Sequence, residues 1–178
     1  MSPPVIAEEQ TAVAQVCMGK SAPSEGAGPP GVVPANGLRE ARVLYLFAGA
    51  RRRSGLAKSL RVACKGTGIR VFVDEIDILR GGRQHDLLRR AYREKIMAKV
   101  RQGYYQLAAA SPPCGTFSRS RSANNRGPKP IRSKKFPLGF PWLQGSSLMQ
   151  ARCANTLVDF TAEVLAAQME TTPGLTIL

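Results

Sequence analysis

One cysteine, Cys114, stands in the segment of this chain that is best suited to covalent chemistry. It follows two prolines, Pro112 and Pro113, and an apolar run over 104–110 ends directly before them. Each proline fixes a backbone φ and lacks an N–H donor, so we expect the chain to leave a strand abruptly here. A cysteine at such an exit points toward the space where α/β proteins bind ligands. A passive cysteine in a proline-rich loop is the alternative, and the short motif alone leaves both open.

A long basic segment follows the cysteine. Nearby cations favour the thiolate, which is the nucleophilic form of a cysteine. Residues 119–145 show no regular pattern, and irregular loops of this length are usually functional or disordered. The candidate phosphate contacts in this loop are Arg119, Arg121, Arg126, Lys129, Arg132, Lys134 and Lys135. The aromatic side chains of Phe136, Phe140 and Trp142 follow; they suit base stacking, and equally they could fix the loop to the core.

Positive charge is concentrated in the middle of the chain. Residues 39–135 hold 24 Lys and Arg against six Asp and Glu, a net charge of +18, whereas the whole chain carries +14. A block this basic is typical of a surface for a polyanion, most often nucleic acid. A basic protein that is merely soluble is the alternative.

Alternating apolar runs and helical patterns predict an α/β domain over residues 39–178. The uninterrupted run 42–47 and the run 69–73 are typical of strands buried on both faces of a parallel sheet. Ser54 is expected to cap a helix over 55–65, and Asp86 a second helix over 87–102. The run 104–110 is the third expected strand. A long helix from Ser146 or Ser147 to about residue 169 precedes a fourth strand, 175–178.

The first two strands and their helix would form a βαβ unit. In such a unit the first turn and the acid that ends the second strand meet at the carboxyl edge of the sheet. Gly49 would let a ligand approach the backbone, and Glu75 or Asp77 would accept hydrogen bonds from a ribose. One glycine and two acids are a weak pattern on their own.

The remaining composition limits what the chain can be. Residues 1–38 are rich in Pro, Gly, Ala and Ser, and we expect a disordered tail rather than a secretory signal. The four cysteines are widely spaced and the single histidine, His85, has no cysteine near it, so we expect no metal site. No apolar stretch is long enough to cross a membrane. We expect a soluble, intracellular protein, in a eukaryote a nuclear one, with reduced thiols.

With these pieces placed, the chain resembles the cytosine-5 DNA methyltransferase family. Residues 46–49, Leu-Phe-Ala-Gly, are similar to the first cofactor motif of that family, and 74–77, Asp-Glu-Ile-Asp, to its acidic strand end. Pro113-Cys114 with Phe117-Ser118 is similar to the nucleophile motif. The order and spacing of the three motifs agree over about 42–142, more than half of the chain.

The resemblance implies a Rossmann-like sheet with helices on both faces, S-adenosylmethionine as methyl donor, and a flipped cytosine in DNA as substrate. Cys114 would be the nucleophile. The cofactor would be bound by Phe47, Ala48, Gly49, Glu75, Asp77 and Pro113. Unactivated cytosine C5 is a poor nucleophile, and addition of a thiolate to C6 activates it.

The chain also differs from the family pattern. Residues 50–53, Ala-Arg-Arg-Arg, stand where a second motif glycine is usual, and Gly115 replaces a glutamine. The catalytic glutamate of the family would follow the strand that begins at Leu175, beyond residue 178. We therefore expect a truncated domain with impaired methyl transfer. The alternatives are a non-catalytic, basic nucleic-acid-binding module on the same scaffold and a gene fragment without function.

Overall fold

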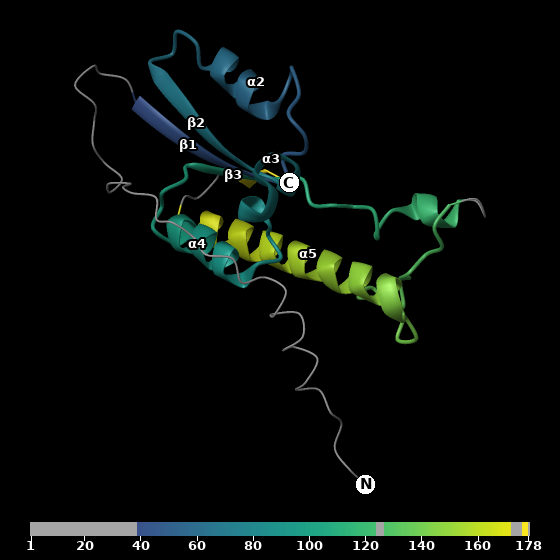
Figure 1. The fold of residues 1–178 in the computed structure, drawn as a ribbon. Coiled ribbons are helices and arrows are strands. Elements are labelled where there is room, and N and C mark those ends of the chain that lie inside the picture. Colours follow the sequence, from purple (N-terminus) through teal and green to yellow (C-terminus); the bar gives the residue numbers. More distant parts are fainter. Residues whose placement is uncertain (1–38, 124–126, 172–175, 178) are drawn as a thin grey trace.

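The computed structural model describes residues 39–123, 127–171 and 176–177, and it has an α/β architecture built on a small parallel sheet (Figure 1). The expected tail, 1–38, lies outside the described residues. The strands are β1 (Arg39–Leu46), β2 (Ile69–Ile76), β3 (Leu107–Ala110) and the two-residue β4 (Thr176–Ile177). The helices are α2 (Leu56–Ala63), α3 (Ile78–Gly81), α4 (Arg90–Arg101) and α5 (Gly145–Thr171), with 3-10 turns η2 (Gly82–His85) and η3 (Arg119–Ser122).

The strands run parallel in the order β2-β1-β3-β4. Val43 in the middle of β1 pairs with Val73 of β2 and with Leu107 of β3. Three strands form the body of the sheet, and β4 extends it beyond β3 through the pair of Ala108 with Thr176. The α/β prediction and the parallel pairing of the apolar runs are confirmed.

The main core lies between the sheet and the two helices α4 and α5. Leu44 and Leu46 of β1 are almost fully buried on this face, because alternate residues of a strand point to the same side. Val100 of α4 and Val164 of α5 are fully buried against them. Figure 1 shows both helices below the sheet and α2 above it. Among the described residues, the short α2 covers the opposite face and buries Ala57.

Several element ends differ from the prediction. Ser54 does not cap the first helix; Gly55 is the N-cap, and no side chain caps α2. The second helix begins at Arg90, because the Asp86 carboxylate accepts the N–H of Leu88 and closes a separate turn before α4. The second strand is three residues longer than predicted and ends at Ile76. The short helix α3 and the turn η2 were not predicted.

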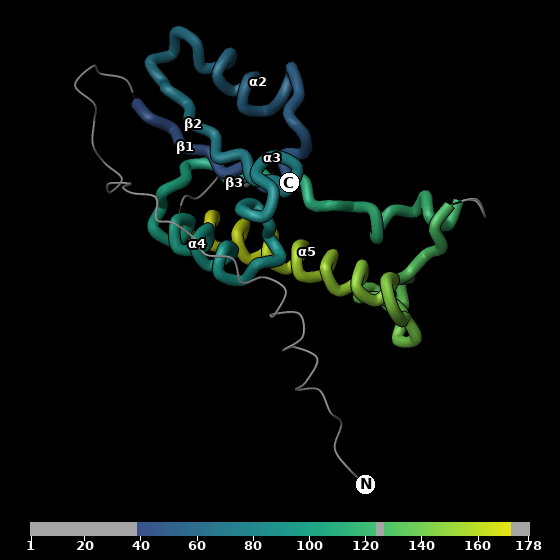
Figure 2. The backbone as a smooth tube through the Cα atoms, viewed as in Figure 1, coloured from purple at the N-terminus to yellow at the C-terminus, as the bar shows by residue number. Residues whose placement is uncertain are grey.

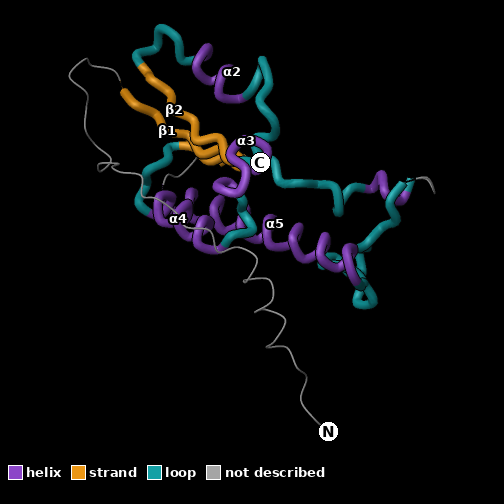
Figure 3. The backbone as a smooth tube through the Cα atoms, viewed as in Figure 1, coloured by secondary structure: helices purple, strands orange, loops and turns teal. Residues whose placement is uncertain are grey.

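The segment between β3 and α5 leaves the sheet and returns along the first half of α5 (Figure 2). Its described residues, 111–123 and 127–144, are loop apart from the single turn η3, as Figure 3 shows. Ile131 of this segment is buried, as are Ala151 and Ala154 on α5. The loop prediction for 119–145 is confirmed in its described part, and the loop packs on its own stretch of helix away from the sheet.

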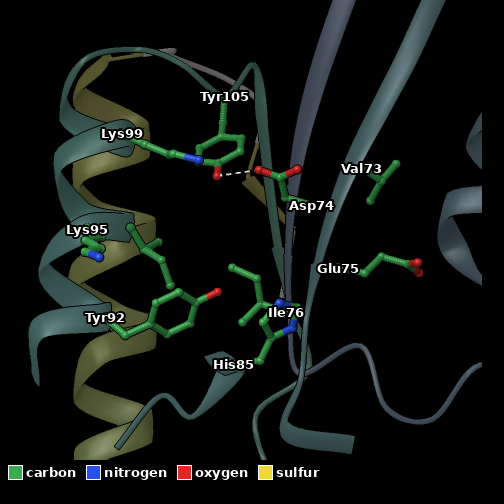
Figure 4. A pocket seen from close by; sticks show the side chains of 10 residues that line it. Val73, Asp74, Glu75, Ile76, His85, Tyr92, Lys95, Lys99 and Tyr105 are labelled. Atoms are coloured by element: carbon green, nitrogen blue, oxygen red, sulfur yellow. Dashed lines mark hydrogen bonds between the residues drawn. The ribbon is translucent and has the colours of Figure 1, made fainter. Parts of the chain in front are cut away.

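A tyrosine on the way into β3 contacts the edge strand of the sheet. The Tyr105 side chain is 1% exposed, and its hydroxyl donates to Asp74 Oδ2 at 2.8 Å. Figure 4 shows this pair in a cavity that Lys95, Lys99 and Tyr92 of α4 also line. Burial, and secondly the Asp74 carboxylate, raise the pKa of the Tyr105 phenol far above its ordinary value of 10.

Tyr105→Phe is expected to make the free energy of unfolding fall less steeply as pH rises above 10. In the wild type the phenol stays protonated in the folded state while the unfolded chain ionises above pH 10, so stability falls as pH rises from there. A difference of one bound proton between the folded and unfolded states changes the free energy of unfolding by about 1.4 kcal/mol per pH unit. Urea unfolding between pH 9 and 11.5 measures this slope. Equal slopes in wild type and Tyr105→Phe would contradict the prediction.

Candidate active site

The candidate site lies at the carboxyl edge of the sheet, where the strand order reverses. From β1 the chain continues to β2 on one side, whereas β3 pairs on the other side of β1. Ligands of open α/β sheets bind in the crevice at such a point, because the loops from adjacent strands diverge there. The turn 47–49 follows β1, Asp77 follows β2 and the segment 111–114 follows β3, so all three sequence motifs reach this edge of the sheet.

The turn after β1 has a strained backbone. Phe47 adopts φ +59°, a conformation in which residues other than glycine are uncommon, and Gly49 follows with φ +68°. The N–H groups of Phe47 and Ala48 both donate to the carbonyl oxygen of Ile76, at 2.8 and 3.3 Å. These bonds from the end of β2 hold the turn in place. Strain of this kind persists where the surroundings fix it, often at ligand sites.

An arginine that the sequence analysis missed joins this turn to the acids. Arg80 Nε donates to the carbonyl oxygen of Gly49 at 2.7 Å, and its Nη1 lies 2.6 Å from Glu75 Oε2. Asp77 Oδ2 accepts the N–H of Gly49 at 2.8 Å. Both predicted acids are therefore adjacent to the turn. The Glu75 carboxylate, the predicted ribose ligand, already has Arg80 as a partner.

A cavity of about 400 Å³ opens beside this network. It brings together three of the predicted cofactor residues, Phe47, Asp77 and Pro113, which come from the ends of all three main strands. The other walls are mostly apolar, and they are Ile78, Leu79, Leu87, Leu88 and Leu157, with Ser111, His85 and Asp86. Ala48 and Gly49 belong to the neighbouring turn, and Glu75 lines a different cavity. The α3 and η2 residues that complete the cavity had no motif to mark them.

Cys114 is an exposed free thiol one residue beyond the cavity wall at Pro113. Backbone bonds hold the surrounding segment: the N–H of Ser111 donates to Leu46 O at 3.1 Å, and the N–H of Phe117 donates to Cys114 O at 2.9 Å. The Tyr45 and Ser111 hydroxyls are 3.3 Å apart. The thiol is accessible to a large substrate while its chain segment is anchored to β1.

Two arginines of the basic loop, Arg121 and Arg132, make hydrogen bonds to other parts of the protein. Arg121 Nε donates to Gly115 O at 2.6 Å, directly after the cysteine. Arg132 Nη1 donates to Asn155 Oδ1 of α5 at 2.9 Å, and its guanidinium lies 3.8 Å from the centre of the Phe117 ring. Burial, and secondly the Arg121 charge, lower the pKa of Arg132. These arginines connect the cysteine segment to the loop and to α5.

The other described cations of the loop are accessible to an external partner, and Lys135 also lies over the Phe136 ring, with Nζ 5.6 Å from its centre. Arg119, Lys129, Lys134 and Lys135 are exposed, and Arg126 lies outside the described residues. Residues 95–158 contain neither Asp nor Glu. The Phe140 and Trp142 rings stack 4.9 Å apart, and Phe136 meets both edge-on. Trp142 is 65% exposed, so this aromatic cluster is accessible as well as structural.

Three comparisons with known proteins give no relative: no family model, no curated protein and no solved structure matches this chain. Within the described ranges, no helix is long and apolar enough to cross a membrane. The same part of the chain has no group of three or more His, Cys, Asp or Glu side chains arranged to hold a metal ion. The class of protein is therefore defined by its fold, an α/β protein with a small parallel sheet.

Proposed function

We propose that this protein transfers a methyl group from S-adenosylmethionine to C5 of cytosine in DNA, with Cys114 as the nucleophile, on a Rossmann-like fold. The observation that carries the proposal is the single cavity lined by Phe47, Asp77 and Pro113 at the point where the strand order reverses. Three motifs that are far apart in the sequence thus meet around one space of nucleoside size, next to an exposed thiol.

The cavity has the chemistry that a nucleoside cofactor needs. Its walls are mostly apolar, which suits an adenine ring, and Asp77 and Asp86 supply negative charge for a cationic group or for hydroxyl donors. The Asp77 carboxylate is fixed by the N–H groups of Gly49 and Leu79, both at 2.8 Å, and each of its oxygens retains a further lone pair. Bound S-adenosylmethionine would supply an electrophilic methyl group.

The remaining chemistry belongs to the chain itself. The Cys114 thiolate would add to C6 of the target cytosine and make C5 nucleophilic. The base must leave the duplex to reach the thiol, and the exposed position of Cys114 permits this. Arg121 would hold the cysteine segment through its bond to Gly115 O. The exposed lysines and Arg119 would contact the DNA phosphates.

A non-catalytic nucleic-acid-binding module is the second candidate. The observation in its favour is that Glu75, the expected ribose ligand, is already bonded to Arg80 at 2.6 Å. A crevice whose acid is bonded to Arg80 can lose cofactor affinity, while the positive charge of the loop 119–145, which contains neither Asp nor Glu, retains affinity for phosphates.

Leu79→Ala is expected to weaken binding of S-adenosylhomocysteine about three- to tenfold without changing stability. Leu79 lines the cavity but is 72% exposed in the free protein, so its side chain is buried only when a ligand binds. Isothermal titration gives the affinity, and thermal unfolding gives the stability. Leu138→Ala is the matched control, because Leu138 is 70% exposed on the distant loop.

These measurements also separate the two candidates. A cooperative unfolding transition raised by S-adenosylhomocysteine, with a smaller increase for Leu79→Ala and a full one for Leu138→Ala, supports the methyltransferase. A cooperative transition that the ligand does not move contradicts cofactor binding and favours the module.

A further inference from the structure

A second cavity, also of about 400 Å³, lies on the α2 side of the sheet and is strongly basic. The 49–55 loop, α2 and the end of β2 surround it. Five of its lining residues are cations, and they are Arg51, Arg52, Lys58, Arg61 and Arg80. The acid among the lining residues is Glu75. Neither the cofactor motifs nor the basic loop includes the four cations that come from the loop and α2.

The positive charge in this cavity is not compensated by the protein. Glu75 is the partner of Arg80, at 2.6 Å. None of the ion pairs among the described residues involves the other four cations, and all four side chains are exposed. Like charges around one small space repel each other, and an anion in that space would remove the repulsion.

The start of α2 adds to the positive potential of the cavity. Gly55, the N-cap, lines the cavity and has no side chain to cap the helix, and Ala57 in the first turn also lines it. The first N–H groups of a helix lack partners within the helix, and the helix dipole is positive at this end. The positive end of the α2 dipole therefore lies beside the space that the four side-chain cations line.

We propose that this cavity is a binding site for a compact oligophosphate, an anion with two or three adjoining phosphate groups. Such an anion carries three or four negative charges within one small volume, which matches four unopposed cations. A nucleic-acid backbone carries a single charge on each phosphate, and these charges are spread along the strand. His85 supplies the one aromatic ring among the lining residues, whereas five of them are cations, so charge rather than base stacking dominates this cavity.

The proposal does not rest on methyl transfer. It depends on the lining of this cavity, which shares none of the four unpaired cations with the cavity beside Cys114. It also gives a role to Arg51 and Arg52, which stand in the segment where the methyltransferase resemblance would expect a glycine.

Isothermal titration of the whole chain with inorganic tripolyphosphate in 50 mM NaCl tests the site. Two variants with equal charge change are compared. The pocket variant replaces Arg51, Arg52, Lys58 and Arg61 with alanine. The loop variant replaces Arg119, Lys129, Lys134 and Lys135 with alanine. The pocket variant is expected to bind tripolyphosphate at least about tenfold more weakly, and the loop variant within about threefold of the wild type.

Other arms of the experiment give independent readouts. A thermal unfolding transition like that of the wild type shows that the pocket variant folds. If it does not fold, the single variant Arg52→Glu is used instead, and it is expected to show the same loss of tripolyphosphate affinity. A retained response to S-adenosylhomocysteine in the pocket variant shows that the two cavities are separate, whatever the outcome for methyl transfer. Equal loss in both variants, or no loss in the pocket variant, overturns the proposal. The proposal is also overturned if tripolyphosphate does not bind to the wild type while binding of a DNA duplex requires these four cations.

Discussion

Cys114→Ser is expected to abolish the covalent capture of DNA that contains 5-fluorocytosine. In the proposed reaction, the thiolate would add to C6 and the methyl group of S-adenosylmethionine would be transferred to C5. Fluorine then stands where a proton would be removed, so the sulfur–carbon bond cannot be broken by elimination and the adduct survives denaturation. A serine hydroxyl is a far weaker nucleophile than a thiolate at neutral pH, because it is almost entirely protonated. We expect captured DNA to fall to background, a loss of at least about a hundredfold.

A denaturing gel with labelled DNA measures this capture directly. Cys64→Ser is the matched control, because Cys64 is also a free thiol but lies at the end of α2, away from the cavity wall at Pro113. The control should capture DNA at the wild-type level. Capture that survives Cys114→Ser would remove the catalytic role of this thiol. Failure of the wild type to capture DNA would leave the nucleic-acid-binding module as the supported function.

The strands could be predicted because their signal is local. Residues 42–47 form an uninterrupted apolar run, and a strand in a parallel sheet with helices on both sides needs such a run. The ends of elements were less predictable. Ser54 has the side chain of a good N-cap, yet α2 begins one residue later, at an N-cap glycine. Capping depends on the backbone conformation at the helix entry, and the extended residue before α2 is Gly55, at φ −112° and ψ 163°.

The motifs were enough to place Phe47, Asp77 and Pro113 in one cavity, but the sequence could not reveal the role of Arg80. Its contact with the carbonyl oxygen of Gly49 joins residues 31 positions apart. That contact exists because β1 and β2 pair in a register that brings the ends of the two strands together. In a chain with so many arginines, nothing in the sequence distinguishes Arg80 as the one that contacts the turn after β1.

The same difficulty applies to the cations of the loop. Arg121 and Arg132 could not be distinguished by sequence from Lys134 or Lys135, since all belong to one basic segment. Their partners are backbone carbonyl oxygens and the amide side chains of α5, which appear only when the loop packs on that helix. The structure thus divides one predicted phosphate-binding set into residues that hold the loop and residues that remain exposed.

This division predicts the outcome of the loop variant, in which Arg119, Lys129, Lys134 and Lys135 are replaced with alanine. Each of these exposed cations that neutralises a phosphate contributes about 0.9 to the slope of log affinity against log salt for duplex DNA. The four together should therefore reduce that slope by about three to four. Because an exposed ion pair contributes about 1 kcal/mol or less, affinity at 50 mM NaCl should fall about 10- to 100-fold.

Fluorescence anisotropy with a labelled duplex between 50 and 200 mM NaCl measures both quantities. The control variant replaces Lys65, Lys95, Lys99 and Arg101 with alanine, which removes the same charge from exposed positions elsewhere in the chain. If the net charge of the protein alone attracts DNA, both variants will lose slope equally, and the loop will have no special role. If the loop is the contact surface, only the loop variant will lose the slope, because counterions are released only where cations meet phosphates.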